Sequence, residues 1–244
     1  MTTFDEVWTS IADVEGWMTR GQGEALFEAA QACPPGGKIV EIGSFRGRST
    51  IVLASGAPPD VTVIAIDPHA GNDRGPQEIE GFEAQAADDH ATFLRNLHAA
   101  GVAERVTHLR LFSGAALDQV PPAIDVLYVD GAHRFAPARA DIGRFGARVR
   151  DGGTMLIHDS FSSIGVTLAI LAELVPSRRW RYVRRSRSLA VYRADPTVDR
   201  RRNAVRQLAQ LPWFVGNVGL KVLLTLGLGR VLRRVGRPVP DWPY

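Results

Sequence analysis

The chain has 244 residues, of which 45% are hydrophobic and 23% are charged, and this predicts one α/β domain with a full core and a short appendage. A single cysteine, Cys33, excludes an internal disulfide framework and a zinc site made of several cysteines. The first residues lack the basic and then apolar pattern of a signal peptide, so the expected compartment is the cytoplasm.

Charge is distributed unevenly along the chain. Residues 199–244 hold nine Lys or Arg and two Asp, a net charge of +7. Because the whole chain carries +3, residues 1–198 carry −4. The net positive charge of the chain therefore comes from residues 199–244, and we predict no nucleic-acid partner for the domain itself.

The first predicted elements are one or two helices within residues 14–33, indicated by apolar residues at helical spacing between Ala25 and Ala30. Trp17 and Met18 come just before this pattern. Two interpretations are open for this pair. The side chains either pack in the core or close over a bound cofactor.

The chain is organised around residues 38–50, where a short apolar run leads through Gly43 and Gly47 into a second apolar run. This pattern predicts a buried parallel strand, a turn and the start of a helix. Because glycine has no Cβ, both glycines allow the backbone to approach a ligand closely. Ser49 or Thr50 can offer a hydroxyl near the helix N-terminus, where unpaired N–H groups favour an anion such as a carboxylate.

The segment from Glu41 to Thr50 reads Glu-Ile-Gly-Ser-Phe-Arg-Gly-Arg-Ser-Thr. It resembles motif I of class I S-adenosylmethionine-dependent methyltransferases, in the form found in the small O-methyltransferases. It lacks the G-x-G-x-x-G dinucleotide fingerprint and the G-K-[ST] ending of a phosphate-binding loop. The resemblance implies that S-adenosylmethionine is the cofactor.

A second buried strand, residues 61–67, ends in Asp67. An acid at this strand end suits a ribose, because its two oxygens can accept hydrogen bonds from both hydroxyls, as in dinucleotide-binding folds. The separation between Gly47 and Asp67 matches the roughly 20 residues of that arrangement. The long polar connection of residues 69–90 is typical of a lid or a binding loop.

The rest of the domain alternates between strands and helices. We predict helices at about 90–100, 137–149 and 164–175, and strands at 106–112, 124–130, 154–159, 179–185 and 188–193. We predict a turn at 151–153, directly before the strand at 154–159. Such alternation requires a parallel sheet with helices on both faces, and the last two strands read as an antiparallel hairpin.

Polar residues follow the strand ends at two further places, Asp130 with His133 and His158 with Asp159. In a doubly wound sheet these ends lie side by side. Carboxylates suit Mg²⁺, and an imidazole among the ligands shifts the preference toward Mn²⁺. Such an ion can lower the pKa of a substrate hydroxyl, and His133 or His158 can then remove its proton. Taken singly, each residue is equally explained as a turn, cap or core residue.

The sequences Val-Asp-Gly-Ala-His133 and His158-Asp159 resemble those of methyltransferase family 24, a relative of the macrocin-type sugar and catechol O-methyltransferases. The resemblance covers about residues 14–194. It implies an α/β, Rossmann-like class I methyltransferase fold, with a seven-stranded, mostly parallel sheet, an antiparallel terminal hairpin and helices on both faces. It also implies methyl transfer to a hydroxyl of a small-molecule, glycan or glycolipid acceptor, assisted by a divalent metal.

The residue patterns and the resemblance together assign roles to individual residues, although His133 has no counterpart in the catechol enzymes. Those expected to bind the cofactor are Trp17, Met18, Glu41, Gly43, Ser44, Arg46, Gly47, Ser49, Asp67, Ser113 and Asp130. Those expected to bind the metal are Asp130, His158 and Asp159, and the candidate bases are His133 and His158. The related metal-dependent enzymes carry two acidic or amide residues where this chain has His158-Asp159, so His158 is open as a ligand, a base or neither.

We expect residues 1–198 to form the methyltransferase domain and residues 199–244 to form a helical, apolar and basic extension. The apolar run at 211–229 contains Lys221, Pro212 and four glycines, which argues against a membrane span. Packing on the domain or on a second subunit, as in a homodimer, is one interpretation. Peripheral contact with a membrane or a lipid substrate is the other.

Three rival hypotheses account for the same residues. One is a metal-independent O- or N-methyltransferase in which the acids orient His133. Another is a nicotinamide-dependent oxidoreductase, although the third glycine of its fingerprint is missing. The third is a membrane-recruited binding module with a vestigial cofactor pocket.

Six arginines lie between Arg178 and Arg187. We expect them to protect a sheet edge from aggregation, with binding of a phosphate or carboxylate as the alternative.

Overall fold

A computed structural model describes residues 2–70 and 82–225. The helices are α1 (Phe4–Ser10), α2 (Arg20–Gln31), α3 (Arg48–Gly56), α4 (Phe82–Ala99), α5 (Ser113–Ala116), α6 (Phe135–Arg148), α7 (Ile164–Glu173), α8 (Arg200–Leu208) and α9 (Leu211–Thr225), with 3-10 turns η1 (Ala103–Arg105) and η2 (Leu117–Gln119). The strands are β1 (Lys38–Ile42), β2 (Thr62–Ile66), β3 (Val106–Leu109), β4 (Ile124–Val129), β5 (Val149–Ile157), β6 (Trp180–Ser186) and β7 (Leu189–Ala194).

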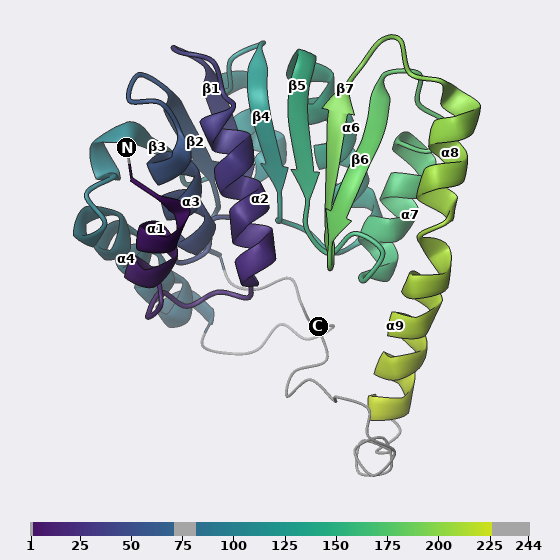
Figure 1. Ribbon diagram of the computed structural model, residues 1–244. Helices are drawn as coiled ribbons and strands as arrows, with labels where there is room; N and C mark the ends of the chain where they lie inside the picture. The colour runs from purple at the N-terminus through teal and green to yellow at the C-terminus, as the bar shows by residue number, and fades with distance from the viewer. Residues whose placement is uncertain (1, 71–81, 226–244) are drawn as a thin grey trace.

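The strands form one seven-stranded sheet in the order β3-β2-β1-β4-β5-β7-β6, which Figure 1 shows face-on. Neighbouring strands are parallel except around β7, which is antiparallel to both β5 and β6. The chain runs outward from β1 to β3 and then returns to place β4 on the other side of β1. Ligands bind at such a reversal, beyond the carboxyl ends of the strands. The predicted fold class is confirmed.

The central strands are buried on both sides, as their sequences predict. β4 is buried at every position, and β1 at every position except Lys38. A parallel sheet covered by helices on both faces requires such continuous apolar strands. The polar groups needed for chemistry are therefore concentrated where the strands end.

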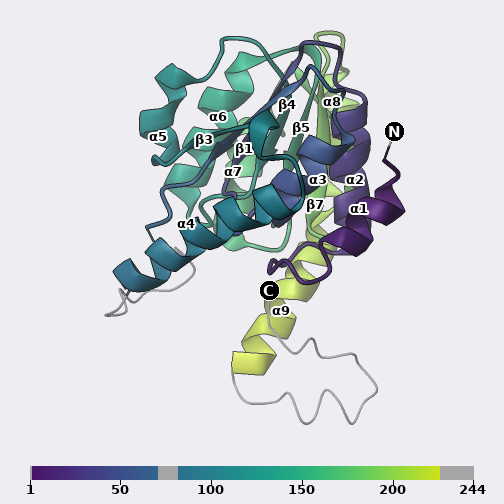
Figure 2. The same ribbon diagram turned by 90° about the vertical axis from the view of Figure 1, so that its left-hand side faces the viewer.

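Two hydrophobic layers sandwich the sheet, as the view in Figure 2 shows. One layer is formed by α1, α2, α3 and α4, with Leu26, Ile51 and Phe93 among its buried residues. The other is formed by α5, α6 and α7, with Ile142, Phe145 and Ile170 in its core. Both layers hold the strand ends in fixed positions, which is what a binding site at that edge requires.

Helix α8 covers the outer edge of the sheet. The Asn203 side chain accepts a hydrogen bond from the Tyr182 N–H at 2.7 Å and donates one to the Trp180 carbonyl at 2.9 Å. Both partners belong to β6, so one amide side chain takes the place of a neighbouring strand. Gln207 adds a bond to the Leu174 carbonyl at 3.2 Å. The boundary predicted between 198 and 199 remains a prediction, although α8 is packed on the sheet.

Helix α9 continues from α8 past the carboxyl edge of the sheet (Figure 1). Its first turns contact the domain, because Leu211, Trp213 and Phe214 pack against the α6–α7 layer. Asn217 donates a hydrogen bond to the Phe161 carbonyl at 3.3 Å. Within residues 2–70 and 82–225, no helix is both long and apolar enough to cross a membrane.

Some predicted boundaries were wrong. β5 begins at Val149 rather than at 154, because the predicted turn is an irregularity inside the strand, with Gly152 at a φ of 77°. α4 begins at Phe82 rather than near 90, so the predicted 69–90 connection is partly helical. Residues 71–81 of that predicted lid lie outside the described residues, as do 226–244 of the tail.

Candidate functional site

The turn after β1 depends on two glycines with positive φ. Gly43 has a φ of 89°, and a Cβ there would lie 2.3 Å from the Asp130 carbonyl oxygen. Gly47 also has a φ of 89° and caps α3, with its N–H bonded to the Ser44 carbonyl at 2.8 Å. A side chain at Gly43 would force β1 and β4 apart at their ends. Glycine at position 43 therefore lets the ends of β1 and β4 lie close together, beside the crevice beyond the carboxyl ends of the strands.

Glu41 lies below this turn and is completely buried. Its carboxylate accepts hydrogen bonds from the hydroxyls of Ser49 and Thr50 in the first turn of α3. Burial raises the pKa of Glu41 to about 8, and the two hydroxyl bonds only partly offset this. The structure thus places Glu41 and Ser49, both predicted cofactor residues, in contact with each other inside the fold.

Asp67 stands at the end of β2, as predicted, and both its oxygens accept backbone hydrogen bonds. Oδ2 accepts from the Phe45 N–H and Oδ1 from the His69 N–H, each at 2.8 Å. The carboxylate therefore ties the turn after β1 to the end of β2. Each oxygen of an ionised carboxylate has a second acceptor site, so capacity for ribose hydroxyls remains.

Ser44 and Arg46 occupy the same turn but differ in their surroundings. Ser44 is 2% exposed, and its Oγ has no hydrogen-bond partner among the described residues. Arg46, in contrast, pairs with Asp89 at 2.8 Å and also contacts Glu15 and Asp88. Ser44 is therefore available to a ligand, while the Arg46 side chain fastens the turn to α4.

The side chains of Trp17 and Met18 have different surroundings in the structure. Met18 packs against the α1–α4 layer, which supports the core interpretation for this residue. Trp17 is 42% exposed, and its ring lies 5.2 Å from the Phe45 ring, centroid to centroid, above the turn after β1. Of the two side chains, Trp17 is the one placed to cover a ligand in the crevice.

Beyond β3 the chain presents Phe112, which is 69% exposed, and then Ser113 at the start of α5. Ser113 hydrogen-bonds to the buried carboxyl of Asp141, whose pKa burial raises to about 6. The predicted cofactor residue is thus engaged by α6. The exposed aromatic next to it was not predicted.

Asp130, at the end of β4, has one oxygen in a hydrogen bond and the other in an ion pair without hydrogen-bond geometry. Tyr128 donates its hydroxyl to Oδ2 at 2.8 Å, and Oδ1 lies 3.2 Å from Nδ1 of His158. Burial raises the pKa of Tyr128 well above its usual value, so this hydroxyl stays a donor. Tyr128 was not predicted, although its position two residues before Asp130 on the strand places it on the same face.

His133 and Asp159 meet across the ends of β4 and β5. Nε2 of His133 lies 2.6 Å from Oδ2 of Asp159, while Nδ1 of His133 has no partner among the described residues. The N-terminus of α7 approaches closely because residue 165 is glycine, where a Cβ would lie 2.2 Å from the His133 carbonyl oxygen. A cavity of about 10 Å³, enough for about one water molecule, is lined partly by Asp130, His133 and His158.

His158 lies between the two acids, with Nδ1 3.2 Å from Asp130 and 3.5 Å from Asp159. Burial disfavours its charged form, but the two carboxylates outweigh burial and raise the pKa of His158 to about 10. Burial likewise opposes ionisation of Asp159, but bonds from His133 and His158 outweigh it and hold the pKa of Asp159 well below its usual range. The cluster is thus a cation between two anions.

Asp130, His158 and Asp159, the predicted metal ligands, are brought together but do not fit a divalent ion as arranged. The imidazole stands between the carboxylates, and the remaining oxygens face Tyr128 and His133. No three His, Cys, Asp or Glu side chains in residues 2–70 and 82–225 converge to hold a metal ion. The metal site stays a prediction.

Backbone strain is concentrated at this edge. Four non-glycine residues just beyond β1, β2 and β5 have positive φ, namely Phe45 at 44°, His69 at 45°, Asp159 at 52° and Phe161 at 55°. Such conformations are costly for residues with a Cβ and cluster at functional sites. The strain marks the same crevice that the strand order identifies.

The sequence and the fold of this chain both resemble those of known proteins. The model of the family described as "Methyltransferase domain", methyltransferase family 24, matches residues 40–160, from within β1 to the residue after Asp159. The O-methyltransferase NovP has a TM-score of 0.55 with 18% identity, over 71% of this chain and 79% of NovP. The O-methyltransferase TomG of Streptomyces achromogenes, involved in tomaymycin synthesis and solved with S-adenosylmethionine, has a TM-score of 0.51 with 17% identity, over 79% of this chain and 89% of TomG.

At these sequence identities the two structures establish only the fold. The family model also matches the segment that carries the predicted motifs. Its matched range contains the glycine turn, Asp67, Asp130, His133 and the His158-Asp159 pair. The chain therefore belongs to the class I S-adenosylmethionine-dependent methyltransferases, within methyltransferase family 24.

Proposed function

We propose that this enzyme is an O-methyltransferase in which His133, held by Asp159, removes the proton from an acceptor hydroxyl. The observation that carries the proposal is the 2.6 Å contact between His133 Nε2 and Asp159 Oδ2, with Nδ1 left without a partner among the described residues. The acceptor is a small molecule, a glycan or a glycolipid. This choice of base and acceptor goes beyond the family assignment.

The cofactor is proposed to bind across the ends of β1, β2 and β4. The residues present fit it, because Ser44 Oγ is buried with no partner in the described part of the chain and Gly43 removes the Cβ that would crowd Asp130. Asp67 would accept the ribose hydroxyls, and Trp17 with Phe45 would cover the ligand. Glu41, Ser49 and Arg46 would act indirectly, by fixing the shape of the turn.

Bound S-adenosylmethionine supplies a methyl group already activated on a sulfonium, so the protein needs mainly to position and deprotonate the nucleophile. Asp159 accepts a hydrogen bond from protonated Nε2 of His133, which leaves the Nδ1 lone pair free to take the hydroxyl proton. This tautomer is inferred from the hydrogen bond. The deprotonated acceptor oxygen would then be able to accept that methyl group, with S-adenosylhomocysteine as the leaving product, and His133 would keep the proton.

His158 is proposed to be a positioning residue rather than the base. Its Nδ1 faces Asp130 and Asp159 at 3.2 and 3.5 Å, so neither carboxylate is left as an isolated buried charge. The ordered Asp159 in turn fixes the His133 ring. This division of roles favours the metal-independent hypothesis over the metal-assisted one.

The compartment and partners predicted from the sequence stay proposals. We infer a cytoplasmic enzyme without a nucleic-acid partner. A homodimer or a peripheral membrane contact through residues 199–244 are the two proposals for the tail, supported by the exposure of Val215 and Val222 on α9.

A panel of phenolic and sugar hydroxyl compounds, incubated with methyl-labelled S-adenosylmethionine, tests the function. We expect label transfer to an oxygen of at least one class, reduced about 100-fold or more in His133→Gln. His98→Gln, which changes an exposed histidine on α4, is the matched control. Binding of the cofactor by both variants, measured by calorimetry, separates loss of the base from loss of the pocket. Transfer to nitrogen only, or full activity in His133→Gln, would overturn the proposal.

A further inference from the structure

The β6–β7 hairpin carries a row of arginines, and three of them, in or just before β6, form ion pairs with acidic residues. Arg179 pairs with Asp151 at 3.3 Å, Arg181 pairs with Asp195 at 2.9 Å, and Arg184 pairs with Glu28 on α2. Each of these cations therefore has a carboxylate partner within the fold. Their role is explained by packing of the hairpin onto its neighbours.

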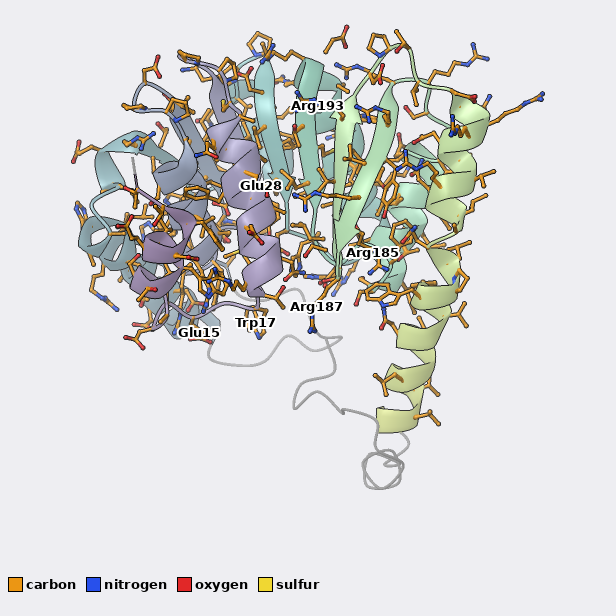
Figure 3. The ribbon with its side chains drawn as sticks, viewed as in Figure 1. Glu15, Trp17, Glu28, Arg185, Arg187 and Arg193 are labelled. Carbon is orange, nitrogen blue, oxygen red and sulfur yellow. The ribbon has the colours of Figure 1, made fainter. Side chains whose placement is uncertain are left out.

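Arg185 and Arg187, at the tip of the hairpin, have no carboxylate partner among the described residues. The tip lies at the carboxyl edge of the sheet, because the Ser188 carbonyl accepts a hydrogen bond from the Ser160 N–H at 2.8 Å. Ser160 directly follows Asp159. Figure 3 shows Arg187 at this lower edge, the same end of the sheet as Trp17. Two cations without a described carboxylate partner thus lie at the same edge of the sheet as the proposed catalytic pair.

Arg185 is held in place for binding. Its guanidinium carbon lies 3.8 Å from the centroid of the Trp213 ring on α9, and Nε donates to Gln210 at 3.2 Å. Nη1 donates to the Arg187 carbonyl, which links the two arginines. The Tyr182 side chain also hydrogen-bonds to Arg185. Arginine has five N–H donors, so donors remain beyond the bonds to Gln210, the Arg187 carbonyl and Tyr182. A stacked, ordered guanidinium loses little side-chain entropy when it binds an anion.

Protection of a sheet edge does not account for this pair. α8 already covers β6, since Asn203 takes the Tyr182 N–H and the Trp180 carbonyl. Arg187 lies in the turn itself, with a φ of 49°, rather than on the strand edge. The alternative weighed from the sequence, binding of a phosphate or carboxylate, therefore becomes the better explanation.

We propose that Arg185 and Arg187 bind an anionic group of the methyl acceptor, a phosphate or a carboxylate. This inference rests on the proposed function, because it places the acceptor hydroxyl at His133 and the anion at the hairpin tip. Arginine forks match the planar or tetrahedral oxygens of these groups. The acceptor class narrows to hydroxyl compounds that also carry a negative charge, either free in solution or in a lipid headgroup.

The test uses the full chain and the double variant Arg185→Gln/Arg187→Gln. Arg178→Gln is the matched control, because it removes an exposed arginine without a described partner at the opposite end of β6. Three probes are titrated, namely inorganic phosphate, acetate, and vesicles of phosphatidylglycerol compared with vesicles of phosphatidylcholine. Tryptophan fluorescence is the readout, with Trp213→Phe identifying the signal from the ring below Arg185.

We expect saturable binding of at least one anionic probe, weakened at least tenfold in the double variant and unchanged in the control. Binding of phosphate or acetate would indicate a soluble acceptor, and binding of the anionic vesicles alone would indicate a lipid headgroup. No saturable binding of any probe, or equal binding by the double variant, would overturn the proposal. Cofactor binding and methyl transfer to hydroxyl compounds are measured in parallel, so failure of the anion site is distinguishable from failure of the proposed function.

Discussion

Nε2 of His133 lies 2.6 Å from Oδ2 of Asp159, although the two residues end different strands and stand 26 positions apart. We infer from this contact that Nε2 carries the proton, and Nδ1 has no partner among the described residues. A general base needs this arrangement, with one nitrogen anchored and the other open. The first prediction concerns that anchor.

Replacing Asp159 with Asn should disturb the His133 tautomer. An amide can donate as well as accept, so Nε2 no longer has to carry the proton. Nitrogen-15 spectra of the ring should show mainly protonated Nε2 in the wild type and a mixed population in Asp159→Asn. Asp151→Asn, which changes an exposed acid, is the control. An unchanged spectrum in Asp159→Asn would contradict the assigned role.

Replacing Asp67 with Asn should weaken cofactor binding. The variant loses the charge, and its amide nitrogen cannot accept one of the two backbone N–H groups from Phe45 and His69. Hydrogen bonds to charged groups are worth about 1.5–3 kcal/mol, so affinity should fall about tenfold to 100-fold. Calorimetric titration with S-adenosylmethionine measures this, and Asp60→Asn, an exposed acid before β2, should bind normally.

Glu41 should make stability depend on pH. Its folded-state pKa of about 8 lies above the usual value of 4.5, so the folded protein retains a proton that the unfolded chain releases. The free energy of unfolding should therefore decrease as pH rises from 4.5 to about 8, with a slope of up to about 1.4 kcal/mol per pH unit from this group.

Glu41→Gln should remove that slope and gain stability relative to the wild type near pH 8, where the folded Glu41 carboxyl titrates. Urea unfolding at a series of pH values measures the effect. Glu24→Gln, at an exposed position on α2, should leave the slope as it is. A wild-type protein whose stability rises across this interval would show that Glu41 is ionised in the fold.

Removal of metal should leave methyl transfer intact. The position between Asp130 and Asp159 is taken by the His158 imidazole, which supplies positive charge there. Activity is compared after treatment with EDTA and after adding back Mg²⁺ or Mn²⁺. Loss of activity that either ion restores would reinstate Asp130 and Asp159 as metal ligands.

The sequence predicted the fold and the position of the crevice because both depend on short-range patterns. Gly43, Gly47 and Asp67 follow apolar runs at fixed spacing, and a parallel sheet brings such strand ends together. The seven-stranded, mostly parallel sheet and its antiparallel terminal pair followed from the resemblance and are confirmed.

The partners of each polar group could not be predicted, because they lie far apart in the chain. Arg46 looked available for a cofactor, yet it pairs with Asp89 across 43 positions. His133 and His158 looked equivalent as bases. They differ because β4 and β5 place His158 between two carboxylates and His133 against one.

The amide of Asn203 has a consequence for assembly. Sheets with an open last strand can grow by recruiting a strand from another chain, which is a route to both dimers and fibrils. Here the Tyr182 N–H and the Trp180 carbonyl of β6 are already taken by a side chain from α8. A chain shortened before α8 would therefore expose these groups, and we expect it to associate through strand pairing along β6.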